Sequence, residues 1–499
     1  MKKIVLTLLV LVLSLLFLFP RSVELINGNP VFGFDQGREY LAVYNILVNH
    51  KFILIGTELG AGSAGINGLF HGPIYYYLLT IPFILFNGDP AGGTYLIFFF
   101  NLTAAVFLFY FVRKIFGLWP AVLAAFIMAV SPIFISQARF LWSPNPPAFF
   151  ILLSLYFTYL LRKKSSLIIF LSAFFAAFVY NFEMGTAIPL CIALLIYSVY
   201  IFGKDIKKYL FLFSGFIVGF LPMILFEIRH NFLGLNGLIT YLLGDKSQNS
   251  YETRFIADHF NAIVYNFNNT FGLEQILPVS LFYIPSIIIL GLIIYFFKKE
   301  KNRDFKNLVI YFFILVVTTF VVFLPLQNAL YGYYLTDLSL FYIILFAYIV
   351  FSAYKNKEWR IFYPLIIFAV LLVAYSIPQQ FKTTRQDLAD YGGTAKLKGK
   401  VDAIDYIYKD ANGKPFNLLV FSPPVYTYPY DYLIQWHGKT KYNYVPGQEK
   451  EGTFYLLIEP DPQKPWSYKG WLETVIKDGK IIKTQMLPSG FIVQKRTFE

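Results

Sequence analysis

The sequence predicts an all-α polytopic membrane protein with about eleven transmembrane helices and a small extracytoplasmic α/β domain at its C-terminal end. Three observations predict this class. The 499 residues are 57% hydrophobic and only 14% charged, more apolar surface than soluble domains of ordinary size can bury. The apolar residues gather in long runs separated by short basic loops. From about residue 378 the composition changes to charged residues, turn formers and alternating strands.

The charge distribution describes topology rather than a ligand. A formal net charge of +13 could indicate nucleic-acid binding, but most of the excess lies in the short loops between apolar runs. Loops of this kind remain on the cytoplasmic side of a membrane. The positive charge therefore predicts which loops face the cytoplasm.

The first apolar segment, Ile4 to Phe19, follows Lys2-Lys3 and could be a signal peptide. The residues after it, Pro20 to Glu24, offer no clean cleavage site of small residues. The segment is also just long enough to span a bilayer. We expect a retained first helix that starts in the cytoplasm.

The stretch 21–92 is predicted to be an extracytoplasmic loop with interfacial helices. Residues 35–49 have the pattern of an amphipathic helix, and 56–68 form a loop rich in Gly and Ser. The apolar run 73–86 is short for a membrane span. If it crossed the membrane, every later basic loop would lie outside, so we expect it to rest in the interface.

With that choice the later spans and basic loops follow in order. The spans fall near 93–112, 117–135, 147–161, 167–181, 185–203, 209–226, 278–297, 308–325, 337–354 and 361–377. The loops Arg113-Lys114, Arg162 to Lys164, Lys204 to Lys208, Lys298 to Lys306 and Lys355 to Arg360 then share the cytoplasm with Lys2-Lys3. The prediction is a multi-pass protein of the cell membrane with a cytoplasmic N-terminus and an extracytoplasmic C-terminal domain.

The chain thus divides into a transmembrane domain, 1–377, and a soluble α/β domain, 378–499. In the second, a helix near 400–408 precedes strands at 416–421 and 454–459. The aromatic run 426–437 could form a sugar-binding face, although exposed strands often carry aromatic residues.

Polar residues that interrupt or directly flank apolar runs lie on the predicted outer face. Ionisable side chains from several separate segments on one membrane face indicate a site. The candidates are Asp35, Arg38, Glu39, His71, Arg139, Asn145, Glu183, Glu227, Arg229 and His230.

Most of these candidates also have a simpler interpretation. Arg139 could be an interfacial anchor, and Glu183 could face water in a short turn. Glu227 could form a local ion pair with Arg229 or His230. The tyrosine runs 75–77 and 331–334 could belong to an aromatic belt. Asp35 differs because it precedes an apolar-faced helix beside the bilayer and has no basic residue next to it.

This set of residues favours one kind of chemistry. A water-accessible carboxylate at the membrane surface can act as a general base on a hydroxyl, while Arg and His neutralise a phosphate. The sequence has no Walker loop, no Cys and His spacing for a metal, and no serine nucleophile elbow. Soluble nucleotide-driven chemistry is not expected, and no metal ligand set is predicted.

These motifs resemble the GT-C glycosyltransferases that use polyprenyl-phosphate sugars. The resemblance rests on Asp35 early in the outer loop, the run His71-Gly72-Pro73 with three tyrosines after it, and Ala138-Arg139-Phe140 ahead of a span. It points to the protein O-mannosyltransferase and aminoarabinose-transferase branch (glycosyltransferase family 39-like). Asp-Gln-Gly-Arg and Phe226 to His230 are similar to a bacterial variant of that branch. The resemblance covers about 1–377.

The resemblance implies a membrane transferase that moves a sugar from a polyprenyl-phosphate donor to an acceptor hydroxyl outside the cytoplasm, with inversion. It implies that Asp35 is the catalytic base and makes Arg139, Arg229 and His230 candidates for the lipid phosphate. Asn145 stands where family members often carry a second acid, which leaves Glu39, Glu183 or Glu227 as substitutes.

The partners so implied are the lipid-linked donor, a glycan, lipid or protein acceptor, and membrane lipids. No cofactor is predicted with certainty, and a divalent metal is possible but not indicated. A transporter or flippase of a lipid-linked or amphipathic solute is the main alternative. Against it, the polar residues gather at one interface, and the sequence shows no inverted repeat. A non-catalytic scaffold is a third interpretation.

Overall fold

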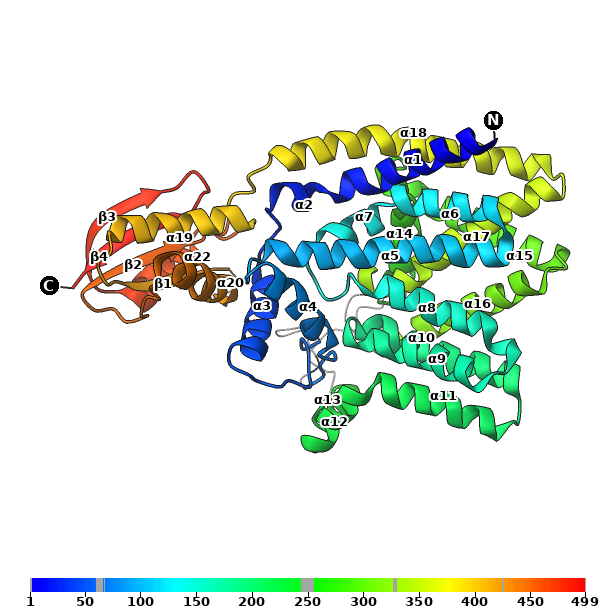
Figure 1. The fold of residues 1–499 in the computed structure, drawn as a ribbon, viewed down its shortest axis with the longest axis horizontal. Helices are drawn as coiled ribbons and strands as arrows, with labels where there is room; N and C mark the ends of the chain where they lie inside the picture. Colours follow the sequence, from blue (N-terminus) through cyan, green and yellow to red (C-terminus); the bar gives the residue numbers. More distant parts are fainter. Residues whose placement is uncertain are drawn as a thin grey trace.

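The computed structural model describes residues 2–59, 66, 68–243, 255–325, 330–423 and 426–498. It consists of a large helical part and a small domain built on one sheet, which lies beyond one end of the helices (Figure 1). The predicted class, a polytopic helical membrane protein with a small α/β domain, is confirmed.

The helical part contains most of the chain. By length and composition, six of its described helices can cross a membrane, or up to eight if each of two bent pairs counts as one span. Its helices are α1 (Lys2–Arg21), α2 (Val23–Asn27), α3 (Phe34–Leu47), α4 (Ile74–Leu85), α5 (Ala91–Phe116), α6 (Leu118–Val130), α7 (Pro132–Arg139), α8 (Pro147–Tyr159), α9 (Ser166–Phe178), α10 (Met184–Phe202), α11 (Ile206–Gly219), α12 (Leu221–Arg229), α13 (Leu233–Leu243), α14 (Phe255–Phe271), α15 (Tyr283–Lys299), α16 (Arg303–Phe323), α17 (Thr336–Lys355) and α18 (Trp359–Ala389).

Two predicted spans are broken near their outer ends. The segment predicted at 117–135 bends by 60° between α6 and α7, and the segment at 209–226 bends by 70° between α11 and α12. The first break has a local cause, because the residue before a proline is pushed out of the helical region. Ser131, which precedes Pro132, is extended with ψ 123°. Helix α7 therefore turns across the outer end of the bundle.

Arg21 binds the carbonyl groups that this break leaves without helical partners. Its Nη1 donates to the Ala129 carbonyl at 2.8 Å and its Nη2 to the Met128 carbonyl at 2.9 Å. Its Nε donates to Oδ1 of Asn101 at 2.9 Å. A cation at the C-terminus of a helix also interacts favourably with the helix dipole. The end of α1 thus fixes the point at which α6 gives way to α7.

The centre of the bundle is α17. Helix α17 and the turn before it span Gly332–Lys355, and 94% of the most apolar 18-residue window in this segment is buried inside the protein. Helices α6, α8, α14 and α18 pack around it. By contrast, α4 has 12 residues and is about 18 Å long, too short to cross a hydrocarbon core of about 30 Å.

Figure 1 shows α3 and α4 at the end of the bundle that carries the sheet domain. The connections from α5 to α6, α8 to α9, α10 to α11, α15 to α16 and α17 to α18 lie at the other end, with the N-terminus. These are the basic loops of the sequence, so the structure places them together on one side. The C-terminal domain lies on the opposite side.

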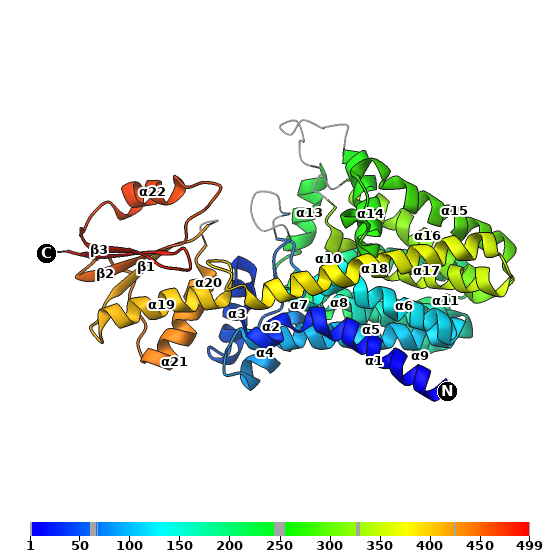
Figure 2. The same ribbon diagram turned by 90° about the horizontal axis from the view of Figure 1, so that it is seen from above.

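The C-terminal domain is a four-stranded mixed sheet with helices on both faces (Figure 2). Its strand order is β1-β2-β4-β3, with β1 and β2 parallel and the other pairs antiparallel. The strands are β1 (Asn417–Phe421), β2 (Thr453–Ile458), β3 (Lys480–Met486) and β4 (Ile492–Thr497), and the helices are α19 (Leu397–Ala411), α20 (Tyr428–Leu433), α21 (Lys439–Tyr442) and α22 (Ser467–Trp471). The predicted helix and both predicted strands match α19, β1 and β2. Helix α18 continues to Ala389, twelve residues past the expected domain boundary.

The C-terminal domain docks directly on α3 through α20. The two backbones are so close that a Cβ on Gly37 would lie 2.3 Å from the Pro429 nitrogen. Trp436 Nε1 donates to the Asn87 carbonyl at 2.8 Å, and the Tyr432 hydroxyl donates to the Gly88 carbonyl. The aromatic run is helical from Tyr428 onward rather than a strand, and Tyr432 points inward against the loop between α4 and α5.

Candidate active site

The site begins at the first turn of α3, where Asp35 and Arg38 form an ion pair. Arg38 Nη2 lies 2.6 Å from Asp35 Oδ1, and the guanidinium also lies over the Phe34 ring. The sequence interpretation gave Asp35 no basic neighbour, and this was wrong because residues three apart face each other on a helix. The Asp35 side chain is 34% exposed, so a substrate can reach its carboxylate.

The start of α3 is fixed by Gln36. Its Oε1 accepts from the Gly33 amide at 2.9 Å, and its Nε2 donates to the Leu141 carbonyl at 2.7 Å. The first bond caps the helix and the second ties it to the loop that follows α7. The position of Asp35 is thereby set relative to residues 140–146.

Glu39 lies one turn further along α3, and unlike Asp35 its side chain is buried. It is fully buried, and neither carboxyl oxygen has a hydrogen-bond partner. Burial first and the Asp35 charge second hold the pKa of Glu39 well above its ordinary value. Burial therefore favours the protonated form of Glu39. The groups that face it are the Tyr75 hydroxyl and the Ser143 amide.

His71 and Glu183 form a second buried pair. His71 Nδ1 lies 3.0 Å from the Thr57 hydroxyl, and His71 Nε2 lies 3.7 Å from Glu183 Oε1. Burial, with a smaller effect of Arg38, lowers the pKa of His71 to about 4. Burial raises the pKa of Glu183 to about 8. At neutral pH both groups are thus mainly uncharged. Glu183 also caps α10 by accepting from the Gly185 amide at 2.9 Å.

The tyrosines after His71 connect these groups and do not form an aromatic belt. Tyr75 and Tyr76 are 1% and 5% exposed, which excludes them from the lipid interface. The Tyr75 hydroxyl faces Glu39, and Tyr76 lies within reach of Arg38. The side chains of α3 and α4 therefore form one continuous polar cluster with His71 and Glu183. In the run 331–334, Tyr334 is buried and Tyr331 is exposed.

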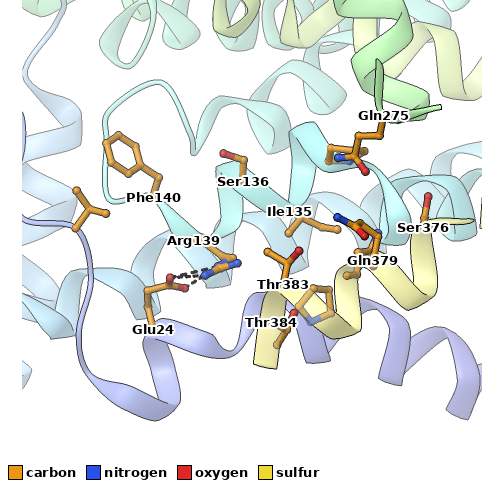
Figure 3. Close-up of a pocket in the computed structure, with 14 residues that line it drawn as sticks. Glu24, Ile135, Ser136, Arg139, Phe140, Gln275, Ser376, Gln379, Thr383 and Thr384 are labelled. Atoms are coloured by element: carbon orange, nitrogen blue, oxygen red, sulfur yellow. Dashed lines mark hydrogen bonds and ion pairs between the residues drawn. The ribbon is translucent and has the colours of Figure 1, made fainter. Parts of the chain in front are cut away.

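Arg139 lies in a separate cluster at the end of α7. Its Nη2 is 2.8 Å from Glu24 Oε1 and its Nη1 is 2.8 Å from Asp387 Oδ2. Figure 3 shows Arg139 and Glu24 pointing toward each other from different helices. The guanidinium of Arg139 thus binds two carboxylates, Glu24 from α2 and Asp387 from α18. A cavity of about 310 Å³ lies beside them, lined by Pro20, Glu24, Val31, Pro132, Ile135, Ser136, Arg139, Phe140, Gln275, Ser376, Gln379, Gln380, Thr383 and Thr384.

A second cavity, of about 560 Å³, lies on another side of α7, and we call it the amide cavity. Four amide side chains line it, with one carboxylate and several aromatic rings. Its lining residues are Pro132, Ile133, Ser136, Gln137, Phe140, Trp142, Asn145, Ala262, Tyr265, Asn266, Asn269, Glu274, Leu330, Gly332 and Tyr333. Asn145 lies in this wall, and its Nδ2 donates to the Phe140 carbonyl.

The remaining predicted residues lie at α12 and α13. Glu227 accepts from the amides of Gly234 and Leu235 at 3.1 and 3.2 Å, so it caps α13. His230 Nδ1 lies 2.9 Å from the Phe226 carbonyl. Both Arg229 and His230 are exposed. Within the described ranges, no hydrogen bond or ion pair joins them to Asp35 or Arg139.

The structure thus brings together Asp35, Arg38, Glu39, His71 and Glu183. It places Arg139 in an ion-pair cluster of its own, and the 227–230 segment adjoins the residue before His71 through the ring contact of Phe226 with Phe70. The sequence reasoning missed Gln137, Asn266 and Asn269 in the amide cavity. A signal for two of them existed: Asn266, Asn268 and Asn269 interrupt an otherwise apolar helical run. No group of three or more His, Cys, Asp or Glu that could hold a metal ion occurs among the described residues.

The comparisons with known proteins find the fold in solved structures. No family model matches the sequence. The curated proteins contain no match either. ArnT from Cupriavidus metallidurans matches in its apo state with a TM-score of 0.61 and 11% identity, covering 99% of this chain and 98% of ArnT. The same protein bound to undecaprenyl phosphate matches with a TM-score of 0.57 and 9% identity, covering 98% and 97%.

The archaeal oligosaccharyltransferase AglB from Archaeoglobus fulgidus also matches, with a TM-score of 0.47 and 16% identity over 98% of this chain and 74% of AglB. That score is too low to support an argument. The ArnT alignments include the C-terminal domain, which the sequence resemblance did not cover. At 9 to 11% identity the likeness concerns the fold alone: over nearly its whole length, this chain has the polytopic fold of ArnT from Cupriavidus metallidurans.

Proposed function

We propose that this protein is a membrane glycosyltransferase that transfers a sugar from a polyprenyl-phosphate donor to an acceptor hydroxyl on the extracytoplasmic side. The observation that carries the proposal is the accessible carboxylate of Asp35, held by Arg38 at the outer end of a bundle with the ArnT fold. A solved structure of ArnT is bound to undecaprenyl phosphate, the class of lipid we propose for this chain. The N-terminus would lie in the cytoplasm and the C-terminal domain outside.

In the proposed reaction, Asp35 accepts the proton of the acceptor hydroxyl. The hydroxyl oxygen attacks the anomeric carbon as the bond from that carbon to the phosphate oxygen breaks, which inverts the configuration. The bonding electrons leave with the polyprenyl phosphate. A cation beside the phosphate stabilises the negative charge that develops on it.

We assign that cation to Arg38 rather than Arg139. Arg38 shares its charge with one carboxylate, and its buried Nε has no hydrogen-bond partner among the described residues. Arg139 is bound by two carboxylates, so a phosphate there would meet net negative charge. His71 is neutral and can act only as a hydrogen-bonding group.

Glu39 does not supply the second carboxylate that the family resemblance leads one to expect near Asn145. Its carboxyl group is buried, and burial favours its protonated form. Burial also raises the pKa of Glu183 to about 8. We therefore propose that Asp35 is the acid that acts on the substrate.

The transporter interpretation lacks a supporting observation. A transporter would need a polar cavity near the middle of the membrane. The two polar cavities described here lie beside α7, next to the loop that binds the Asp35 helix through Gln36. This position favours a role for the cavities in transfer.

The test compares two aspartates that each pair with an arginine. Purified protein in liposomes would be given a panel of polyprenyl-phosphate sugars, and released polyprenyl phosphate would be measured. Asp35→Asn should lower the rate by about 10²- to 10⁴-fold without lowering the melting temperature. Asp387→Asn, the matched control, should keep transfer. Normal activity in Asp35→Asn would refute the role of Asp35.

A further inference from the structure

We propose that the amide cavity binds a pyranose sugar without negative charge, belonging either to the lipid-linked donor or to a glycan acceptor. This inference rests on the proposed function and assigns a second part of the same site. Its volume of about 560 Å³ falls within the range of about 300–1,000 Å³ that is typical of small-molecule sites.

The first observation is a buried polar atom that lacks a partner. Gln137 is 6% exposed and lines the cavity. Its Nε2 donates to the Thr336 hydroxyl at 2.9 Å, which fixes the orientation of the amide. Its Oε1 has no hydrogen-bond partner among the described residues. A buried acceptor of this kind is unfavourable when it stays unpaired, and a small movement of the amide toward the cavity would let a ligand hydroxyl satisfy it.

The second observation is the set of amides around it. Asn266 is held by the Gly332 carbonyl and the Ser339 hydroxyl. The half-buried side chain of Asn269 makes no hydrogen bond to the part of the chain that the structure describes. Amides offer both donors and acceptors, which matches the hydroxyl groups of a sugar.

The third observation is an aromatic wall. The rings of Trp142 and Tyr333 lie nearly perpendicular, at 68°, with centroids 4.7 Å apart. Such rings present flat apolar faces beside polar groups. A pyranose has the same two properties, because its C–H faces are apolar and its edges carry hydroxyls.

The charges of the described lining disfavour an anionic ligand. Among the described residues, no Lys, Arg or His lines the cavity, and Glu274 is the one carboxylate. A phosphate or a uronic acid would meet a negative charge from Glu274 and no positive partner from these residues. This agrees with the assignment of the lipid phosphate to Arg38.

The cavity also adjoins the proposed catalytic base through the loop 140–146. Trp142 and Asn145 line the cavity, while Ser143 between them faces Glu39 on α3. Leu141 of the same loop is bonded to Gln36. One loop thus has the cavity on one side and the Asp35 helix on the other.

The experiment measures binding as well as turnover. The variants are Asn269→Leu and Gln137→Leu, and the matched control is Gln379→Leu, an amide that lines the other cavity. The probes are polyprenyl-phosphate glucose, sugar-free polyprenyl phosphate and maltotriose, each titrated into purified full-length protein. Melting temperatures confirm that the variants are folded.

Asn269→Leu should weaken binding of a sugar-bearing probe by about 2- to 10-fold and leave sugar-free lipid unchanged. Weaker binding of the glucose-bearing lipid identifies the donor sugar, and weaker binding of maltotriose identifies the acceptor. Unchanged binding of both, equal loss for sugar-free lipid, or equal loss in Gln379→Leu would overturn the inference. If wild type binds sugar but transfers none, the proposed function fails while this inference stands.

Discussion

The outer end of the protein carries two arginine clusters that look alike in sequence and differ in structure. In the first, Arg38 pairs with Asp35 within one turn of α3, and the acid is 34% exposed. In the second, Arg139 joins α2, α7 and α18 by binding Glu24 and Asp387. The second cluster uses all of its positive charge to hold segments together. The first leaves donors available for a substrate.

This difference suggests that the first cluster binds substrate and that the second stabilises the fold. An ion pair between neighbours on one helix stabilises a fold by about 0.3–0.5 kcal/mol, so the Asp35–Arg38 pair contributes little to stability. A largely buried cluster leaves unpaired charge when one member is removed, which is strongly destabilising. The same substitution in the two clusters should therefore affect different properties.

The largest effect is expected for Arg38→Gln. Loss of the cation beside the leaving phosphate should lower transfer by about 10²- to 10³-fold, measured as release of polyprenyl phosphate. The melting temperature should fall by only a few degrees, because the pair is partly buried and joins two residues of one helix. A large fall in melting temperature would show that the pair is structural.

Arg139→Gln is the matching change in the second cluster. It leaves Glu24 and Asp387 without their cation, and we expect a loss of about 2–3 kcal/mol in unfolding free energy, seen as a lower melting temperature in detergent. Transfer per folded molecule should remain. If transfer disappeared while the melting temperature held, Arg139 would belong to the phosphate site.

Gly37→Ala tests the support behind the first cluster without touching either arginine. The added Cβ would lie 2.3 Å from the Pro429 nitrogen, so α3 and α20 must separate, at a cost of about 1–2 kcal/mol. We expect faster proteolysis between α18 and α19 and a rate of transfer lower by about 10-fold. Gly291→Ala, where no heavy atom lies within 4 Å of the added Cβ, is the control.

The smallest effect at pH 4 is expected for Glu39→Gln. Gln replaces a carboxyl group that is protonated in both the folded and the unfolded state at that pH, so stability at pH 4 should change by less than about 0.5 kcal/mol. The raised pKa of Glu39 means that the folded state holds its proton when the unfolded state has lost it. Wild type must therefore lose stability as pH rises above 4.5, the ordinary pKa. The variant should lack this loss and be the more stable protein at pH 8.

The positions of the helices and strands could be predicted from sequence because they depend on local hydrophobicity and turn residues. The break at Pro132 was also readable, since proline restricts the residue before it. The partners of Arg139 could not be predicted, because Glu24 lies 115 residues away and pairing at that distance depends on packing. The Asp35–Arg38 contact was missed although its spacing of three was visible.

The candidate site was predicted as one group because every polar residue was assigned to the same membrane face. Topology predicts on which side of the bilayer a residue lies, but it does not predict how far apart two residues on that side are. Packing gave Arg139 two carboxylate partners of its own and used Glu227 to cap α13. It also buried Glu39 and Glu183, whose carboxyl groups the sequence could not distinguish from accessible acids.

Arg21 has a consequence for how the chain is assembled during synthesis. Its guanidinium binds carbonyls of α6, one of them 108 residues later in the chain. A charged group in a bilayer without partners is costly, so Arg21 must stay in contact with water or headgroups until α6 has been inserted. The first helix therefore reaches its final depth only after the sixth has arrived. Helix α1 is made before α6, yet it is locked in place only after α6 has been inserted.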